Sequence, residues 1–474
     1  MKTIELIKNR IKNARCSVLG FGVSNIPLVE LLLECGNEIT VHDKNAFDKL
    51  DVRSKEFAER GVKFITGEEY LEKIDADIIF RSPGIRPDYN GIIRAVEKGA
   101  ELTSEMELFL ELTPAVILGI TGSDGKTTTT TIAYKLLEKE FENSDRKIYV
   151  GGNIGMPLLS KVGEMTEQDI CVLELSSFQL FTAKKSPSRA IITNLSPNHL
   201  DWHKDMGEYI DAKTNIYKNG ATHLTLNGNN ELSKNLLVDD RVKTSLFSCE
   251  FTYEDIEKRY RTHSEEKSES AIFIDDGYIC RYNNNHISKV LDVNSILIPG
   301  KHNIENYMAA ISLTWGLVSE STISHIAKTF GGVEHRLEFV RELDGVKYYN
   351  SSIDSSPTRT AAALSALPIK PIVICGGYDK NIPFEPLADA LNEKAKSVVL
   401  TGATAEKIND ALNNINSQID IYFEKDFDKA VMKAKNIAKK DDIVLLSPAC
   451  ASFDAFKNFM ERGNKFKQIV NEFK

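Results

Sequence analysis

A glycine-rich segment reads LGITGSDGKTT at 118–128, between a stretch that predicts a strand and a stretch at 129–140 that predicts a helix. In this context glycines let backbone N–H groups turn towards a phosphate at the positive end of the helix. Lys126 would add a point charge, and Thr127 would offer a hydroxyl to Mg²⁺. The usual spacing has glycine where Ile120 stands, so the loop is a variant, and a chance lysine in a glycine turn is the alternative. The segment predicts ATP binding through the terminal phosphates.

Two polar residues that follow other predicted strands are candidates for the same site. Glu174 ends the apolar stretch at 171–174, where an unpaired carboxylate is costly unless a magnesium ion beside a phosphate neutralises it. His199 lies in TNLSPNHLDWH at 193–203, beyond another predicted strand, where open α/β sheets bind ligands. It would ligate a second metal ion or bind phosphate, or it is an ordinary hydrogen-bonded loop residue.

A second glycine turn, GFGVSN at 20–25, resembles half of a dinucleotide-binding fingerprint, and Asp43 stands where its ribose-binding acid would lie. Such a turn binds the diphosphate of any nucleotide, so it predicts a nucleotide-like ligand without identifying nicotinamide. Lys213 lies on a predicted helix, and its surroundings in the sequence indicate a surface lysine.

Composition restricts the class of protein. The 474 residues predict about three domains, and 42% hydrophobic with 27% charged residues indicates folded, globular domains. A net charge of -9 argues against a nucleic-acid partner. Residues 1–15 contain no signal-peptide core, so we expect no membrane insertion and a cytoplasmic location. We also expect a monomer. Seven scattered cysteines without a CxxC pair indicate reduced, mostly buried thiols.

Short β-branched runs alternate with helical stretches throughout the chain, which predicts an α/β fold with parallel sheets covered by helices. Three series of such elements can be separated, with boundaries that give domains at 1–112, 113–333 and 334–474. Within the second, residues 271–282 predict a hairpin, and 254–268 predict a solvated excursion. A long helix at 453–473 is expected to end the third.

Five segments are similar in order and spacing to the Mur ligase family: 121–127, GGNIG at 151–155, 174–179, NHLD at 198–201 and His335-Arg336. The resemblance covers nearly the whole chain. It implies a Rossmann-like UDP-substrate-binding domain, a central P-loop ATPase domain with a mostly parallel sheet, and a Rossmann-like amino-acid-binding domain at the C-terminus.

Within this family, three segments most resemble the member that adds D-glutamate to UDP-N-acetylmuramoyl-L-alanine during peptidoglycan precursor synthesis: SPGI at 82–85, ELSSFQL at 174–180 and LSPACASFD at 446–454. The Asp-Asn-Pro-Arg segment that marks the diaminopimelate-adding member is absent from the sequence. The implied reaction passes through an acyl phosphate and yields ADP and phosphate. The alternatives are another Mur-family ligase or a ligase like folylpolyglutamate synthase; a P-loop switch or a dehydrogenase leaves more of these segments unexplained.

The resemblance also implies a role for each site residue. Thr127 and Glu174 would hold one Mg²⁺, and His199 and Lys213 the other, with Lys213 as a carbamate because a protonated amine cannot bind a metal. The catalytic residues implied are Lys126, Glu174, His199 and Lys213. The residues implied for ATP are Gly122, Ser123, Asp124, Gly125, Lys126, Thr127, Thr128, Asn303 and Arg336. Those implied for the UDP portion are Ser24, Asn25, Asp43, Ser82, Pro83 and Gly84; for muramoyl-alanine, Asn153, Ser176 and Gln179; and for D-glutamate, Lys380, Ser452 and Phe459.

One segment departs from the family pattern. The family commonly has Asn-Asp-Ser-Lys-Ala-Thr-Asn where this chain reads NSSIDSS at 350–356, so that Ser351 and Ile353 replace an acid and a lysine. Asp124, where asparagine is common, is a milder departure. The contacts of the 350–356 segment with the amino acid therefore cannot be carried over from the family.

Overall fold

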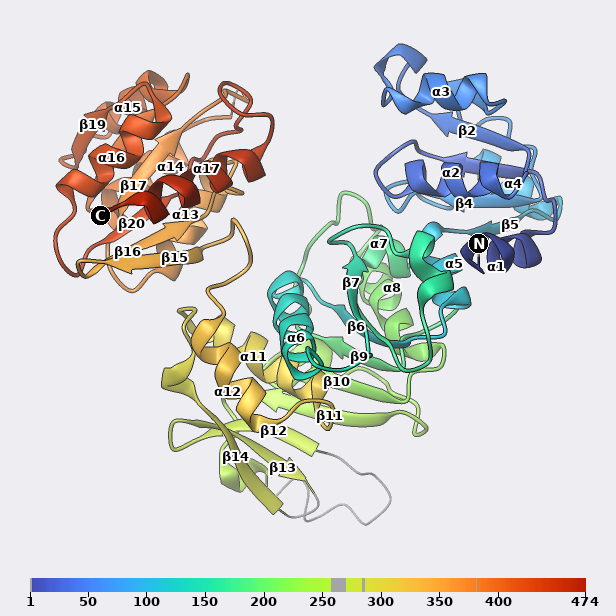
Figure 1. The fold of residues 1–474 in the computed structure, drawn as a ribbon, viewed down its shortest axis with the longest axis horizontal. Helices are drawn as coiled ribbons and strands as arrows, with labels where there is room; N and C mark the ends of the chain where they lie inside the picture. The colour runs from blue at the N-terminus through green and yellow to red at the C-terminus, as the bar shows by residue number, and fades with distance from the viewer. Residues whose placement is uncertain (1, 257–269, 284–285, 381) are drawn as a thin grey trace. The chain divides into compact units, whose positions relative to one another are not determined.

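A computed structural model describes residues 2–256, 270–283, 286–380 and 382–474 of the chain. The chain forms two compact units (Figure 1). The first contains Met1–Val293 and Glu305–Ile326, and the second contains Asn294–Ile304 and Ala327–Lys474.

The first unit begins with a parallel sheet of order β3-β2-β1-β4-β5, drawn in blue in Figure 1. Its strands are β1 (Cys16–Leu19), β2 (Ile39–Asp43), β3 (Lys63–Thr66), β4 (Ile78–Arg81) and β5 (Glu101–Thr103). The helices of this region are α1 (Lys2–Ile11), α2 (Asn25–Glu34), α3 (Arg53–Glu59), α4 (Asn90–Glu97) and α5 (Glu105–Leu112), with the 3-10 turn η1 (Phe47–Lys49). β1 and β4 are buried at every position, as expected of strands covered on both faces. The strand order is that of a Rossmann-like sheet, in which the order of the parallel strands reverses between β1 and β4.

The same unit contains a larger sheet of order β14-β13-β12-β11-β10-β9-β6-β8-β7. Its strands are β6 (Val116–Thr121), β7 (Ile148–Gly152), β8 (Ile170–Glu174), β9 (Arg189–Ile192), β10 (His223–Asn227), β11 (Lys243–Ser248), β12 (Ser270–Asp275), β13 (Tyr278–Asn283) and β14 (His286–Asp292). Only the β12–β13 and β13–β14 pairs are antiparallel within its described residues. The main helices that follow its strands are α6 (Lys126–Glu140), α7 (Ser177–Leu180), α8 (Met206–Lys218) and α9 (Glu231–Lys234), and η2 (Leu159–Glu164) precedes β8.

The second unit is built on a sheet of order β15-β16-β20-β17-β18-β19. Its strands are β15 (Glu338–Leu343), β16 (Val346–Asn350), β17 (Ile372–Gly376), β18 (Ser397–Thr401), β19 (Asp420–Phe423) and β20 (Ile443–Leu446), with only β15 antiparallel to its neighbour. Its helices are α13 (Pro357–Ala366), α14 (Glu385–Lys394), α15 (Ala405–Asn414), α16 (Phe427–Ile437) and α17 (Phe459–Glu472). The chain between the two larger sheets carries η3 (Val293–Ser295), α11 (Lys301–Thr314) and α12 (Glu320–Thr329).

The fold confirms the predicted α/β class, the mostly parallel sheets and the hairpin, which is formed by β12 and β13. The terminal helix was predicted too long: α17 starts at Phe459 and not at Phe453, because Asn458 caps it by accepting a hydrogen bond from Glu461 N. Most of the predicted excursion at 254–268 lies outside the described residues. Among the helices described, none is long and apolar enough to cross a membrane.

Candidate active site

The glycine-rich loop connects the end of β6 to the start of α6, as the sequence predicts. Gly122 has a φ of +151° and Gly125 a φ of +78°, and Gly125 caps the helix. A Cβ on Gly122 would lie 1.9 Å from Thr193 Oγ1, so no side chain fits there. The first helical turn contains Lys126, Thr127 and Thr128, whose backbone N–H groups have no acceptor inside the helix by helix geometry. This arrangement is suited to an anion at the helix start.

Polar contacts hold the loop in shape. Lys126 Nζ donates to the backbone oxygen of Ser123 at 2.8 Å, which keeps the ammonium group over the loop. Ser123 Oγ lies 3.0 Å from Ser196 O and 2.9 Å from Tyr209 Oη. Asp124 is exposed, and its backbone N–H donates to Asn194 Oδ1 at 2.9 Å. The loop is therefore fixed by residues that follow β9 and by α8.

Glu174 is the last residue of β8 and lies beside Ile120 of β6 in the sheet. Its side chain is 1% exposed. Oε1 accepts a hydrogen bond from Asn153 Nδ2 at 2.8 Å, and Oε2 is buried with no hydrogen-bond partner among the described residues. A buried carboxylate oxygen without a partner is costly, and a bound cation would remove that cost. Glu174 therefore fits a divalent metal ion.

Lys213 is not the surface residue that its sequence context indicates. It lies on α8 and is only 2% exposed. Nζ donates to the backbone oxygen of Gly122 at 2.8 Å and lies 3.3 Å from Thr121 Oγ1, so α8 brings it directly behind the phosphate loop. Burial, and then the charge of Lys126, lowers the pKa of Lys213 well below its usual value. The neutral amine is thus favoured.

His199 lies in the loop after β9 and has a φ of +54°. Its ring packs against Phe178 with centroids 4.9 Å apart. Burial, and then the charge of Lys126, lowers the pKa of His199, which favours the neutral imidazole that binds metals. Across the part of the chain that the structure describes, no three His, Cys, Asp or Glu side chains gather as a metal cluster.

The residues predicted to bind uridine diphosphate lie near the point where the strand order of the first sheet reverses, between β1 and β4. Asn25 Nδ2 donates to Gly20 O at 2.8 Å, and Asp43 Oδ2 accepts from Phe21 N at 2.7 Å. Both side chains therefore shape the 20–25 turn, with Ser24 at the start of α2. A Cβ on Gly20 would approach Ser82 Cβ to 3.0 Å, so the 82–84 turn after β4 lies against it. The carboxyl ends of β1 and β4 form the crevice that binds ligands in this type of sheet.

The predicted muramoyl-alanine residues lie around the end of β8. Asn153 contacts Glu174 through its side chain and also through its backbone, where its N–H donates to Glu174 O at 2.8 Å. Ser176 and Gln179 cap α7 reciprocally: Ser176 Oγ accepts from Gln179 N, and Gln179 Oε1 accepts from Ser176 N. These three side chains are thus held beside Glu174.

The remaining predicted residues belong to the second unit. Asn303 donates to Pro299 O at 2.6 Å, and Arg336 is exposed. Lys380 Nζ lies 3.3 Å from both the backbone oxygen and Oγ of Ser355, within the segment that departs from the family pattern. Ser452 is buried, and the backbone oxygen of Phe459 accepts from Ser352 Oγ at 2.8 Å. Lys380 and Phe459 are therefore both tied to the 350–356 segment.

Comparison with known proteins gives the family. Residues 120–314 match the model of the Mur ligase middle domain, and residues 335–450 match that of the Mur ligase glutamate ligase domain. A protein of Ruminiclostridium cellulolyticum named UDP-N-acetylmuramoylalanine--D-glutamate ligase is 46% identical over 99% of both chains. The chain belongs to the Mur ligase family. The protein of the same name from Clostridium novyi is also 46% identical, again over 99% of both chains.

Solved structures of Mur ligases share the fold. A UDP-N-acetylmuramoyl-L-alanyl-D-glutamate--2,6-diaminopimelate ligase superposes with a TM-score of 0.55 at 15% identity over 92% of both chains. UDP-N-acetylmuramate-alanine ligase from Thermotoga maritima superposes with a TM-score of 0.52 at 17% identity, over 97% of this chain and all of that chain. At these identities the likeness concerns the α/β fold of the family.

Sequence reasoning missed four residues of this Mur ligase that hold its proposed binding loops. Arg81 and Arg86 flank the 82–85 turn, and Trp202 follows His199. In the second unit, Arg462 is buried and donates to the backbone oxygens of Ser352 at 2.9 Å, Cys450 at 3.1 Å and Ala451 at 3.0 Å. Two arginines around a proline-glycine turn were a visible signal, whereas the burial of Arg462 depends on packing that is remote in sequence.

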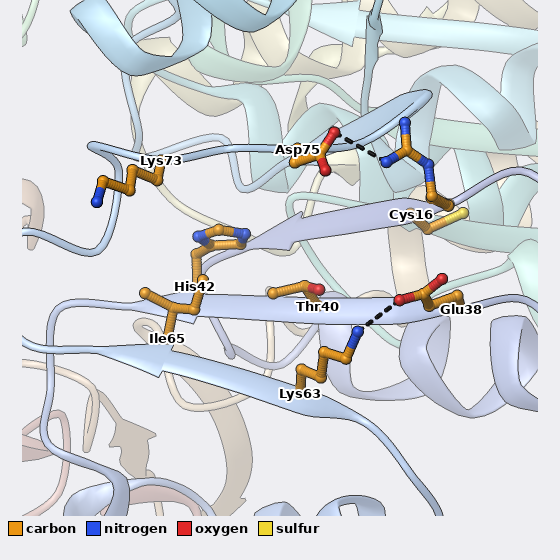
Figure 2. A pocket seen from close by; sticks show the side chains of 9 residues that line it. Cys16, Glu38, Thr40, His42, Lys63, Ile65, Lys73 and Asp75 are labelled. Atoms are coloured by element: carbon orange, nitrogen blue, oxygen red, sulfur yellow. Dashed lines mark hydrogen bonds and ion pairs between the residues drawn. The ribbon is translucent and has the colours of Figure 1, made fainter.

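The first, five-stranded sheet of this protein also carries a cavity of about 170 Å³ (Figure 2). Its charged side chains are largely paired: Lys63 with Glu38 at 2.6 Å and Arg15 with Asp75 at 2.8 Å. None of the predicted uridine residues lines it. The lining residues are Arg15, Cys16, Glu38, Thr40, His42, Lys63, Ile65, Lys73 and Asp75. We therefore place the candidate active site at the strand ends described above and not in this cavity.

Proposed function

We propose that the chain is an ATP-dependent ligase that joins D-glutamate to UDP-N-acetylmuramoyl-L-alanine, in the cytoplasmic synthesis of peptidoglycan precursors. The observation that carries this proposal is 46% identity over 99% of the chain to proteins named for that reaction. Such a reaction requires groups that bind phosphate and a cation. The phosphate loop lies at the start of α6, and Glu174, whose Oε2 has no partner among the described residues, pairs with the strand that leads into this loop.

The proposed reaction has two steps. The alanyl carboxylate attacks the γ-phosphorus of ATP, forming an acyl phosphate as the bond to ADP breaks. The amine of D-glutamate then attacks the acyl carbon, loses a proton, and displaces phosphate as the amide forms. Lys126 and the N–H groups of the loop would bind the phosphates and offset charge as the two anions approach each other.

Four residues near the phosphate loop are proposed to hold the two magnesium ions that the family resemblance implies. Thr127 and Glu174 would hold one ion, and His199 and Lys213 a second. Bound Mg²⁺ supplies positive charge that offsets repulsion between the phosphates and the carboxylate. Burial lowers the pKa of Lys213 and so favours the neutral form that adds to carbon dioxide, which supports its proposed modification to a carbamate.

We assign the remaining roles by domain, with boundaries at 1–112, 113–333 and 334–474. In the first domain Ser24, Asn25, Asp43 and the 82–84 turn would bind the uridine diphosphate. In the central domain Asn153, Ser176 and Gln179 would position muramoyl-alanine, and Gly122 to Thr128 with Asn303 would bind ATP. In the last domain Arg336 would contact ATP, and D-glutamate would be held by Lys380, Ser452 and Phe459.

The proposal is tested by measuring phosphate release from ATP with Mg²⁺ and UDP-N-acetylmuramoyl-L-alanine. D-Glutamate is compared with L-glutamate, other amino acids and no amino acid. We expect release only with D-glutamate, which would also show that the altered 350–356 segment accepts this substrate. Release with a different amine would retain the ligase chemistry but overturn the specificity, and no release with any amine would overturn the proposed function.

A further inference from the structure

Arg81 and Arg86 flank the 82–85 turn of the five-stranded sheet. Both side chains bond to helices that follow strands of the nine-stranded sheet of the same unit. Arg81, at the end of β4, is 1% exposed. Its guanidinium donates within the turn to Pro83 O at 3.0 Å and Ile85 O at 2.7 Å. It also donates to Phe178 O of α7 at 2.9 Å. Arg81 thus joins the turn to the short helix that follows Glu174.

Arg86 makes the second connection. It donates two hydrogen bonds to the carboxylate of Glu208 on α8, at 2.9 and 3.0 Å, and one to the backbone oxygen of Trp202. Its guanidinium also lies over the Trp202 ring, 4.8 Å from the centroid. This fork-to-fork geometry needs arginine, because a lysine ammonium cannot make the paired bonds. Arg86 therefore fixes both ends of the 202–208 segment.

Trp202 makes a third connection, from the loop that contains His199 back to the 82–85 turn. Its indole Nε1 donates to Gly84 O at 2.9 Å, so the loop that contains His199 holds the 82–84 turn. Phe178 packs against both rings of that loop, 4.9 Å from His199 and 4.8 Å from Trp202. The proposed uridine turn and the proposed metal-binding loop therefore share one set of directional contacts.

We infer that Arg86 and Trp202 are positioning residues that couple the uridine-binding turn at 82–84 to the His199 loop beside the phosphate site. The inference rests on the proposed function, which assigns UDP and ATP to these two places. Displacement of the turn by a ligand must move or strain the Trp202 bond and the Arg86 fork, and these contacts restrain the 199–203 loop. Packed side chains and hydrogen bonds of this kind can carry energetic coupling between two sites, and such coupling acts equally in both directions.

The test is titration calorimetry of UDP-N-acetylmuramoyl-L-alanine binding, with and without Mg²⁺ and a nonhydrolysable ATP analogue. The ratio of the two dissociation constants measures the coupling. Trp202→Phe keeps the ring but removes the donor to Gly84, and Arg86→Lys keeps the charge but removes the fork. The matched control is Arg15→Lys, which disrupts an arginine fork to Asp75 and Asp77 within the first domain.

We expect the unmodified chain and Arg15→Lys to show a ratio of about five or more. Trp202→Phe and Arg86→Lys should bring the ratio close to one, and Trp202→Phe should weaken binding without the analogue about two- to tenfold, as for one lost hydrogen bond. A purely structural role would lower the unfolding temperature and leave the ratio unchanged. An unchanged ratio in both variants, or no coupling in the unmodified chain, would overturn the inference while precursor binding and turnover persist. Absence of precursor binding to the unmodified chain would overturn the proposed function as well.

Discussion

At the scale of single residues, Glu174 is a buried acid, one of whose oxygens has no hydrogen-bond partner among the described residues, and this predicts a large effect of removing the acid. Glu174→Gln retains an oxygen for Asn153 and the side-chain volume but removes the charge that would hold a cation. We expect phosphate release to fall by about 100-fold or more, as when a group that stabilises developing charge is removed. Asp211→Asn, an exposed acid on α8, is the control and should retain turnover. Full activity of Glu174→Gln would contradict the metal assignment.

Lys126 supports a second prediction at the same scale. Its ammonium lies over the loop through the 2.8 Å bond to Ser123 O, where it would meet the phosphates of ATP. Lys126→Ala should abolish measurable phosphate release because it removes the point charge, while the glycine turn itself persists. The variant should retain its circular dichroism spectrum and unfolding temperature. Turnover comparable to that of the unmodified chain would remove Lys126 from the proposed mechanism.

Cys450, in the LSPACASFD segment at 446–454, illustrates the opposite case. Cys450 is buried, and burial raises the pKa of its thiol to about 11, so the reactive thiolate is scarce at neutral pH. Its Sγ lies 3.1 Å from Thr404 Oγ1, a contact that a serine hydroxyl can replace. Cys450→Ser should therefore change phosphate release less than about fivefold, since the expected loss is below about 1 kcal/mol. A loss as large as that of Glu174→Gln would show that the thiol takes part in the reaction.

At the scale of elements, α5 contains a buried acid that should make stability depend on pH. Burial raises the pKa of Glu105 to about 7, and Oε1 has no hydrogen-bond partner among the described residues. An acid whose pKa is raised on folding destabilises the folded state as it ionises, so the cost is absent below about pH 4.5 and complete above about pH 7. Glu105→Gln should raise the free energy of unfolding by about 3 kcal/mol at pH 8 and leave it almost unchanged at pH 4.

Urea unfolding followed by circular dichroism at the two pH values measures this difference. The control is Glu111→Gln on the same helix, because the Glu111 side chain is half-exposed and pairs with Arg10. Exposed ion pairs contribute less than about 1 kcal/mol, so this variant should show little effect. An equal gain for Glu105→Gln at both pH values would mean that ionisation is not the cause.

The arrangement of the elements also explains which site residues the sequence could indicate and which it could not. Lys126, Glu174 and His199 were found because the carboxyl ends of parallel strands meet at one edge, so residues after successive apolar runs converge there. Lys213 was misjudged because its burial depends on how α8 packs behind the phosphate loop, and no local pattern encodes that contact. The bonds of Arg86 reach residues more than 100 positions away, so motif spacing gives the turn but not its partners.

At the scale of the whole molecule, the proposed substrates are divided between the two compact units. The residues proposed for UDP and most of those for ATP lie in the first, and those proposed for D-glutamate lie in the second. The amine must reach an acyl phosphate before water does, so the proposed reaction predicts that the protein closes during turnover to exclude water. Small-angle X-ray scattering should therefore show a smaller radius of gyration with UDP-N-acetylmuramoyl-L-alanine, Mg²⁺ and a nonhydrolysable ATP analogue than without ligands. Lys126→Ala, which should weaken analogue binding, should show less compaction at the same ligand concentrations, and an unchanged radius in the unmodified chain under saturating ligands would contradict closure.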